Sequence, residues 1–292
     1  MKLGIGINDY AWAGGAARLG PLIGEIARAA DEAGFDRISV ADHFWRSHYM
    51  GSVEGPELEC YTTLGFLAAS TRRAKLTAMV TAASYRQPGL LAKTVTTLDV
   101  LSQGRAWLGI GAGDYEEEAR GLGLPFPSLK ERFEILEETL QICLRMWDGE
   151  HGDDRPYESA HFRLERTLNV PQSLTRPHPP ILLGGRGDKT LRLVARYADA
   201  CNIRPGPDIP QKLETLRRFC DEEGRDFNDV EITCPFAFNI GENGEKVGEL
   251  LNQLRWLAGM GVQTVIGFAP DVDRIKPLEI LGREVIPAAA EL

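Results

Sequence analysis

The chain has 292 residues, of which 43% are hydrophobic and 26% are charged, a composition typical of a globular protein with one large or two ordinary domains. Its formal net charge of −9 argues against sequence-independent binding to nucleic acid or to an anionic membrane. No apolar run reaches the length of a transmembrane helix, and the N-terminal MKLGIGINDY lacks the pattern of a signal peptide. We therefore expect a cytoplasmic protein with neither nucleic-acid nor membrane partners.

Cysteine and histidine spacings give no sign of a disulfide framework or a metal site. The five cysteines are scattered and show no C-x-x-C spacing, so we expect them to be reduced and mostly buried: Cys60, Cys143, Cys201, Cys220 and Cys234. His43 and His48 have the i, i+5 spacing of a loop, and no H-E-x-x-H pattern occurs. We predict no metal ligands.

Short apolar runs alternate with amphipathic stretches along the chain, which predicts alternating strands and helices. The expected strands are Lys2–Ile7, Arg37–Ala41, Lys75–Ala82, Arg105–Ile110, Ile181–Leu183, Ala200–Ile203, Glu231–Asn239 and Thr264–Phe268. The expected helices are Pro21–Ala33, Tyr61–Ser70, Pro88–Leu101, Tyr115–Arg120, Glu131–Trp147, Thr190–Tyr197, Ile209–Glu223, Lys246–Met260 and the closing stretch Val272–Ile286.

Eight strand–helix alternations without a break in composition predict an α/β fold, a single (β/α)8 TIM barrel over residues 1–292. A doubly wound sheet is the alternative. The polar, proline-rich segment Asp148–Pro179 has no clear period, so we expect an insertion after the fourth strand that forms a lid or wall. Active sites of such barrels lie where strands end and helices begin.

The turn Gly184-Gly185-Arg186-Gly187 lies between an expected strand and an expected helix. Glycines let backbone N–H groups approach an anion, and the helix N-terminus adds partial positive charge. Arg186 and Lys189 would add side-chain charge, so the turn indicates a phosphate-binding site. A tight connection in which the glycines serve only the turn remains the alternative.

Asp42-His43-Phe44-Trp45 ends the second expected strand. A histidine beside a carboxylate acts as a general acid or base in many sites, and Trp45 offers a flat apolar wall for a ligand. A loop-capping histidine is the alternative interpretation. Trp12, after the first strand, is a second candidate for the substrate pocket.

Gly109-Ile110-Gly111-Ala112-Gly113-Asp114 follows the fourth expected strand. It does not fit the dinucleotide-binding pattern G-x-G-x-x-G, because Asp114 stands where the third glycine is required. A bare backbone remains, against which a ring or phosphate can lie, and Asp114 either contacts a ligand or caps the following helix. Without a nucleophile motif of its own, the chain is expected to rely on a cofactor.

Several segments together resemble the luciferase-like monooxygenase superfamily. They are Ser39–Phe44, Gly109–Asp114 with Glu116-Glu117-Glu118, Gly121-Leu122-Gly123, Glu131–Leu136 and Pro177–Asn202. The resemblance covers nearly the whole chain and is strongest to the coenzyme F420-dependent oxidoreductases. It implies a (β/α)8 barrel with an insertion after the fourth strand, and a deazaflavin across the barrel mouth with its phosphate at Gly184–Gly187.

The resemblance also assigns roles to residues at the mouth. Asp42 matches a position that lies against the deazaflavin, and His43 matches a histidine proposed as acid or base. Val80 and Thr81 match a bulge after the third strand, often containing a non-prolyl cis peptide, that backs the ring. Asp114 falls where a related sugar-phosphate dehydrogenase has a catalytic glutamate and many relatives have tryptophan, so its acid–base role stays open.

We expect an enzyme that moves a hydride between C5 of coenzyme F420 and a small organic substrate. An FMN-dependent monooxygenase that uses FMNH2 and O2 is the alternative, and a cofactor-binding protein without turnover is a third hypothesis. The sequence does not identify the substrate, although no Lys/Arg pair is evident for a substrate phosphate, which disfavours sugar phosphates. Dimers are common among such barrels by analogy, and the sequence identifies no interface.

Overall fold

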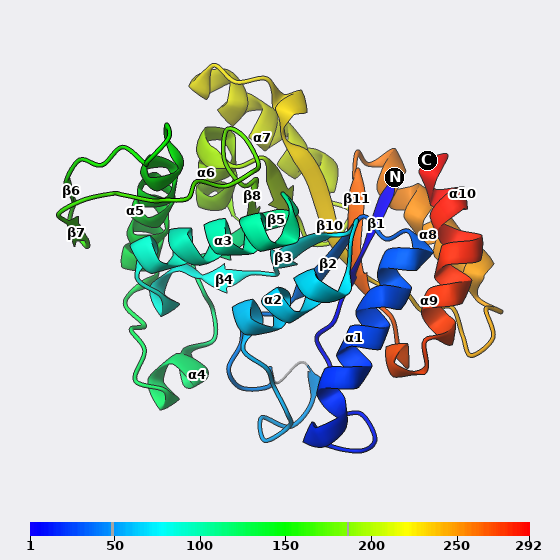
Figure 1. Ribbon diagram of the computed structural model, residues 1–292. Coiled ribbons are helices and arrows are strands. Elements are labelled where there is room, and N and C mark those ends of the chain that lie inside the picture. Colours follow the sequence, from blue (N-terminus) through cyan, green and yellow to red (C-terminus); the bar gives the residue numbers. More distant parts are fainter. Residues whose placement is uncertain (48–49, 186) are drawn as a thin grey trace.

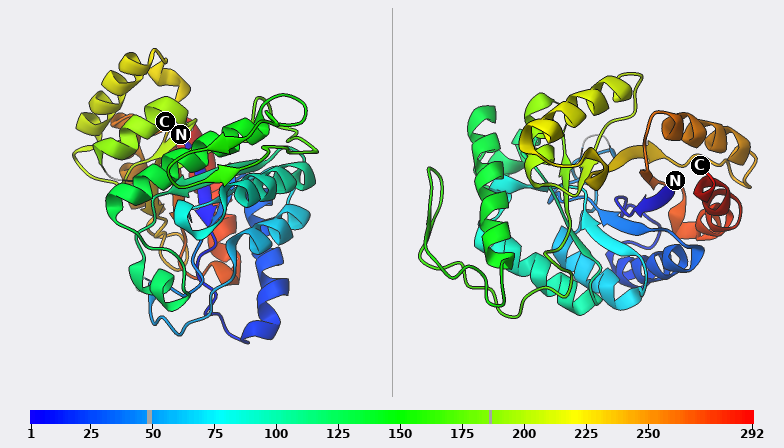
Figure 2. Two further views of the ribbon diagram at one scale, coloured as in Figure 1. Left: turned by 90° about the vertical axis from the view of Figure 1, so that its left-hand side faces the viewer. Right: turned by 90° about the horizontal axis from the view of Figure 1, so that it is seen from above.

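The computed structural model describes residues 1–47, 50–185 and 187–292. His48 and Arg186, a predicted phosphate-site residue, lie outside these ranges. Within them, parallel strands form a closed barrel in the order β3-β2-β1-β11-β10-β9-β8-β5, and pairing of β3 with β5 closes it (Figures 1 and 2). The strands are β1 (Lys2–Gly6), β2 (Arg37–Val40), β3 (Lys75–Ala78), β5 (Ala106–Gly111), β8 (Ile181–Gly184), β9 (Ala200–Asn202), β10 (Glu231–Ala237) and β11 (Thr264–Phe268). The (β/α)8 TIM barrel prediction is confirmed, and closure excludes the doubly wound sheet.

The third predicted strand is interrupted. After β3 the chain passes through Met79 and Val80, whose shared peptide bond is cis, and then forms the short strand β4 (Thr81–Ala82), which pairs with β5. A non-prolyl cis peptide at this bulge is what the family resemblance implied.

Helices surround the barrel (Figure 2). They are α1 (Ala16–Ala33), α2 (Cys60–Ser70), α3 (Pro88–Ser102), α4 (Glu116–Gly121), α5 (Leu129–Trp147), α6 (Asp188–Tyr197), α7 (Ile209–Glu223), α8 (Val247–Gly259), α9 (Lys276–Ile280) and α10 (Ile286–Ala290). Helix α1 begins before the predicted start and contains Pro21. Helix α5 also begins earlier, because Ser128 and Glu131 form a reciprocal capping box at its N-terminus.

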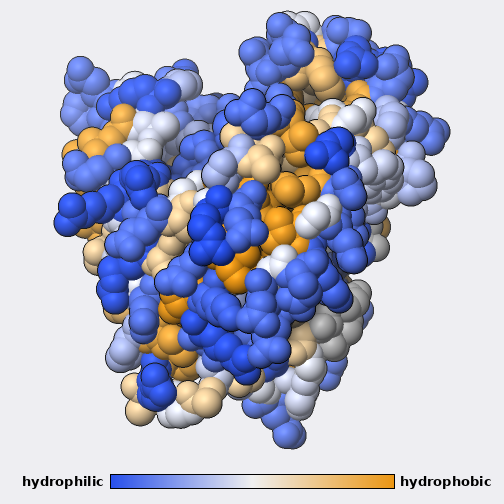
Figure 3. Space-filling model, turned by 90° about the vertical axis from the view of Figure 1, so that its right-hand side faces the viewer, coloured by the Kyte–Doolittle hydropathy of each residue, from blue (hydrophilic) through white to orange (hydrophobic). Residues whose placement is uncertain are grey.

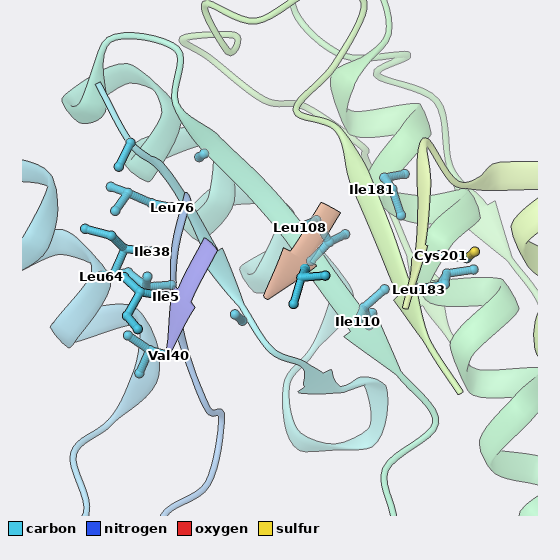
Figure 4. Close-up of a cluster of buried hydrophobic side chains, with 14 of the residues drawn as sticks. Ile5, Ile38, Val40, Leu64, Leu76, Leu108, Ile110, Ile181, Leu183 and Cys201 are labelled. Carbon is cyan, nitrogen blue, oxygen red and sulfur yellow. The ribbon is translucent and has the colours of Figure 1, made fainter. Parts of the chain in front are cut away.

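The main core lies between the barrel and its helices. Alternate strand residues face outward and are buried beneath the helices (Figure 4), among them Ile5, Ile38, Leu76, Leu108 and Ile181, all fully buried. Each such side chain contributes roughly 1.5–3 kcal/mol through its removal from water. On the side that carries α8 to α10, Figure 3 shows hydrophobic residues in a band between hydrophilic ones.

A buried ionic layer fills the amino-terminal end of the barrel interior. Arg37 is fully buried, donates hydrogen bonds to Glu231 (2.7 Å) and Asp36 (3.0 Å), and lies 4.5 Å from the Trp107 ring centroid. Gly4 makes room for it, since a Cβ there would lie 2.5 Å from Arg37 Cγ. The barrel interior is therefore filled at this end. A ligand can enter only at the carboxyl ends of the strands.

The segment between α5 and β8 is neither a lid nor a wall of the mouth, and that expectation is wrong. It carries the hairpin of β6 (Tyr157–Glu158) and β7 (Arg163–Leu164). The backbone N–H groups of Leu174 and Thr175 donate to Asp99 (2.7 and 2.9 Å) in the last turn of α3. That turn leads into the amino end of β5, so the last part of the segment packs at the end of the barrel opposite the mouth, while the hairpin lies along the outside of α5, where His161 Nε2 is 3.1 Å from Glu134. A predicted insertion between strands does not reveal at which end it lies.

All five cysteines are buried and free, as predicted. Among the described residues, no group of three or more His, Cys, Asp and Glu side chains is arranged to hold a metal ion. No helix in the described ranges is long and apolar enough to cross a membrane.

Candidate active site

Glu118 of α4 organises the loop that follows β2. Its side chain is completely buried and accepts hydrogen bonds from the backbone N–H groups of Phe44 (2.7 Å) and Trp45 (2.9 Å) through one oxygen. The other oxygen accepts from the Tyr85 hydroxyl (2.7 Å) and lies 3.4 Å from His43 Nδ1. One carboxylate thus fixes both the backbone and the histidine of this loop.

The predicted catalytic residue His43 lies at the mouth with 28% of its side chain exposed. Its ring meets Tyr115 edge-on, with 5.5 Å between centroids. Burial favours the neutral ring, but the hydrogen bond and negative charge of Glu118 outweigh burial, and the carboxylates of Glu57 and Asp114 add to them, so the pKa of His43 is raised above its usual 6.5. With Nδ1 directed at a carboxylate, Nε2 is the nitrogen left to exchange a proton.

Sequence reasoning quoted Glu118 as part of a motif but gave it no role. The signal was its helical spacing, because Tyr115, Glu118 and Ala119 are buried on one face while Glu116 and Glu117 are exposed. Burial opposes ionisation of Glu118, but the hydrogen bonds from His43, Trp45, Tyr85 and Phe44 outweigh this and lower its pKa. A buried glutamate held ionised in this way is suited to orient a histidine.

Asp42 has a partner that the sequence did not suggest. Arg86 donates two hydrogen bonds to the Asp42 carboxylate, the longer of them 2.9 Å, and one of 2.7 Å to Glu59. The Asp42 side chain is fully buried and that of Arg86 is 12% exposed. The structure therefore gives Asp42 a structural ion pair at the mouth, and its predicted contact with a deazaflavin stays a prediction.

The predicted cofactor residues of three strands lie together. A Cβ at Gly111 would lie 3.1 Å from the Gly184 carbonyl oxygen and 3.2 Å from Val80 Cγ2, and one at Gly184 would lie 3.1 Å from the same methyl group. The glycines thus allow β5, β8 and the Val80 bulge to approach closely. Thr81 is buried and shares a 2.8 Å hydrogen bond with the Tyr61 hydroxyl.

The neighbouring half-buried Ala112 and Gly113 continue this bare backbone. Gly113 has a φ of +77°, which favours glycine, and a Cβ there would lie 3.0 Å from the Cβ of Ala82. The path of the chain out of β5 therefore depends on a glycine at this point.

The turn after β8 leads into the N-terminus of α6 as predicted. A Cβ at Gly185 would lie 2.3 Å from Thr190 Oγ1, so glycine is required there for packing. Gly187 is different: it caps α6 in an ordinary extended conformation, and a Cβ there would meet nothing within 4 Å. Open space in front of a helix N-terminus is compatible with a bound phosphate. Lys189 lies over the Phe133 ring, 5.6 Å from its centroid.

The remaining predicted residues are spread around the mouth. Asp114 is exposed next to α4, whose N-cap is Tyr115, so Asp114 does not cap that helix. Trp45 packs on α4, where a Cβ at Gly121 would lie 1.9 Å from its ring. Trp12 meets Tyr10 edge-on, with 5.9 Å between centroids. Both indoles are half-buried, and their role in a substrate pocket stays a prediction.

Glu57 is a titratable group at the mouth that sequence reasoning missed. Burial raises its pKa to about 7, although the Leu58 N–H and the charges of His43 and Arg46 act in the opposite direction. Its lone position in a polar loop gave no signal. Near neutral pH this carboxyl changes its charge beside His43.

A cavity of about 510 Å³ opens at the carboxyl ends of β1, β10 and β11. Its lining residues are Gly6, Asn8, Ser39, Met79, Pro205, Pro235, Phe236, Ala237, Asn239, Gln253, Ile266, Gly267 and Phe268. Neither Trp12 nor Trp45 is among them. The cavity has the volume of a small-molecule site, and its lining extends to Met79, the residue before Val80.

Comparison with known proteins identifies the family. The model of the luciferase-like monooxygenase family matches residues 16–280. An F420-dependent glucose-6-phosphate dehydrogenase from Nakamurella multipartita is 31% identical over 245 residues, covering 81% of this chain and 69% of the relative. Alignments with further proteins of that name span 53–64% of their length.

Solved structures agree in fold. Monooxygenase RslO1 from Streptomyces bottropensis superposes with a TM-score of 0.80 at 19% identity, covering 98% of this chain and 99% of that one. An F420-dependent secondary alcohol dehydrogenase in complex with an F420-acetone adduct gives 0.80 at 18% identity, covering 99% of both. The matched family model extends over most of the barrel, from α1 to α9. The chain therefore belongs to the luciferase-like monooxygenase family.

Proposed function

We propose that this protein is an F420-dependent oxidoreductase that transfers a hydride between C5 of the deazaflavin and a small organic substrate. The observation that carries the proposal is the His43–Glu118 pair, a proton-exchanging histidine held by a buried carboxylate at the barrel mouth. The 31% identity to a relative named for F420 supports the choice of cofactor.

The residues present fit such a cofactor at both ends. Val80 packs closely against Gly111 and Gly184, so that its side chain covers both glycines and offers an apolar surface for a flat ring. Open space at Gly187, in front of the first N–H groups of α6, suits a phosphate. We assign the ring to the first region and the phosphate to the second.

When bound, the deazaflavin supplies or accepts a hydride at C5. His43 would exchange the accompanying proton at Nε2, while Glu118 accepts from Nδ1 and stabilises the imidazolium form. The Phe44 and Trp45 N–H bonds to Glu118 keep this loop in place, so the histidine needs little reorganisation during the reaction. Asp114 is a second, more exposed candidate for the proton.

An FMN-dependent monooxygenase is the second candidate function. It is favoured by the similarity of the fold to monooxygenase RslO1, and the apolar surface that suits a deazaflavin also suits an isoalloxazine. Titration of the purified protein with oxidised F420 and, separately, with FMN separates the two. Micromolar or tighter binding of F420 with weak FMN binding supports the proposal, and the reverse preference makes oxygen consumption the next assay. Binding of neither refutes a cofactor site at Gly184–Gly187.

Replacement of the histidine tests the mechanism. Because His43 exchanges a proton and is not assigned to the cofactor seat, His43→Ala should lower kcat about 100-fold or more while the Kd for F420 changes little. Unchanged turnover in this variant would remove His43 from the mechanism. Equal losses of turnover and F420 affinity would instead assign His43 to cofactor binding.

A further inference from the structure

We infer that the cavity at β1, β10 and β11 takes a neutral, partly apolar carbonyl compound or the corresponding alcohol, and not a phosphorylated sugar. The inference rests on the proposed function and names its substrate class. It is drawn from the composition of the cavity wall, from the charges around the mouth and from the side of the barrel on which the cavity lies.

No described residue that lines the cavity carries a formal charge. Its polar groups are three amides and a hydroxyl, on Asn8, Asn239, Gln253 and Ser39, which bind a carbonyl or hydroxyl oxygen without requiring charge. Much of the remaining wall is apolar, including Met79, Phe236, Ile266 and Phe268. Such a wall binds hydrocarbon well but does not compensate a phosphate for the loss of its hydration.

Two arginines at the mouth are already paired, whereas Arg204 stands next to the cavity residue Pro205. Arg46 lies 3.0 Å from Asp9, and Arg86 is shared between Asp42 and Glu59. Glu57, Asp114 and Glu118 add three further carboxyl groups on the same side of the barrel. On the side of the mouth that carries His43, these carboxyl groups outnumber Arg46 and Arg86, and their negative field disfavours a phosphate dianion there.

The cavity lies beside the predicted ring seat and does not coincide with it. Val80, Gly111 and Gly184 belong to the wall of β4, β5 and β8 and do not line the cavity. Met79 lines it and is bonded to Val80, so it marks the border between the two regions. A substrate in the cavity is thus placed next to the ring and not behind it.

The reaction balances for this substrate class. In reduction, the carbonyl carbon gains a hydride and the carbonyl oxygen gains a proton, while the reduced cofactor loses one hydride and one proton. The reverse reaction takes the same pair from a secondary alcohol. In the proposed function this proton is assigned to His43 Nε2, although His43 itself does not line the cavity.

The first experiment measures kcat/KM of the protein with reduced F420 on ketones of increasing length. We expect a gain of about fourfold for each added methylene from propanone to 2-pentanone. The anion 4-oxopentanoate, which has the same carbon chain as 2-pentanone, should be at least roughly tenfold poorer. Oxidised F420 with glucose 6-phosphate should give no turnover.

Two charge variants place the substrate in the cavity. Gln253→Lys puts a cation on its wall, and Asn252→Lys makes the same change on the adjacent residue of α8. Both residues are exposed, but only Gln253 lines the cavity. The ratio of kcat/KM for 4-oxopentanoate to that for 2-pentanone should rise roughly fivefold in the first variant and stay unchanged in the second.

The outcomes separate the inference from the proposed function. If F420 does not bind, the proposed function fails and the inference falls with it. If F420 binds but the protein turns over glucose 6-phosphate in preference to ketones and alcohols, or turns over neither of these, only the substrate class is wrong. An equal shift in both lysine variants would show that the cavity is not where the substrate lies.

Discussion

Replacing Glu118 by glutamine tests the central feature of the site. The introduced amide keeps one carbonyl oxygen, which can still accept from the N–H groups of Phe44 and Trp45, but presents an NH2 group to Tyr85 and His43. An amide N–H that faces Nδ1 turns this nitrogen into an acceptor and moves the ring proton to Nε2. The variant therefore holds the histidine in the wrong tautomer with little change in shape.

These contacts indicate how much Glu118→Gln should change the free energy of unfolding and kcat. Loss of a charged acceptor for four donors should cost about 1–3 kcal/mol of unfolding free energy. Loss of the correct tautomer and of the charge that stabilises the imidazolium should lower kcat about 100-fold or more. The Kd for F420 should stay near the wild-type value, because Glu118 does not face the predicted ring or phosphate seat.

The pH profile separates an effect on the histidine from simple damage to the loop. Because Glu118 raises the pKa of His43, activity that requires protonated His43 should persist above pH 6.5 in the wild type and fall as pH rises through the raised pKa. In Glu118→Gln this alkaline limb should move to lower pH. The same linkage predicts that the stability contributed by this pair is fully present between about pH 4.5 and 6.5. It is lost as pH rises through the raised pKa of His43, and also as pH falls through the lowered pKa of Glu118.

Steady-state kinetics over a pH series, with thermal unfolding and F420 titration of the same preparations, make the measurement. Glu117→Gln is the matched control, since Glu117 is exposed on the same helix and should behave as wild type. Wild-type turnover with an unmoved alkaline limb in Glu118→Gln would refute the reasoning. If turnover falls but the alkaline limb of the pH profile does not move, Glu118 only holds the loop in place and does not set the pKa of His43.

Three further changes test other parts of the site. Gly187→Asp should leave the stability of α6 unchanged or slightly raised, because aspartate is a better N-cap than glycine. It should weaken F420 binding at least roughly tenfold, because its carboxylate repels the F420 phosphate. An unaltered affinity would show that the phosphate does not bind at this turn. Asp42→Asn should cost on the order of 3–5 kcal/mol in chemical denaturation, because it leaves Arg86 without its main buried partner, and a loss below about 1 kcal/mol would show that Glu59 compensates. Glu57→Gln should raise the thermal stability above pH 7 and have little effect below pH 4.5. The reason is that the folded-state pKa of Glu57, about 7, lies above the ordinary 4.5, so the folded protein disfavours the charged form. A variant that is less stable than the wild type at high pH would contradict this prediction.

Local patterns in the sequence were sufficient to predict the barrel and the strand ends that form its mouth. Strands such as Thr264–Phe268 and helices such as Ile209–Glu223 have the predicted bounds, because buried strands and amphipathic helices are specified by the period of their apolar residues. The rule that strand ends form the site then selected His43 and the glycines of β5 and β8 without reference to tertiary structure.

Contacts between distant segments were decided only by the tertiary structure. Glu118 lies 75 residues from His43 and Arg86 lies 44 from Asp42, and no local period reports which charged side chain will be buried against which. The Asp148–Pro179 segment was recognised as irregular, but the sequence did not show that its hairpin packs along the outside of α5. A sequence records the hydrophobic period of each element, whereas ion pairs and cavities arise from how the closed barrel brings its elements together.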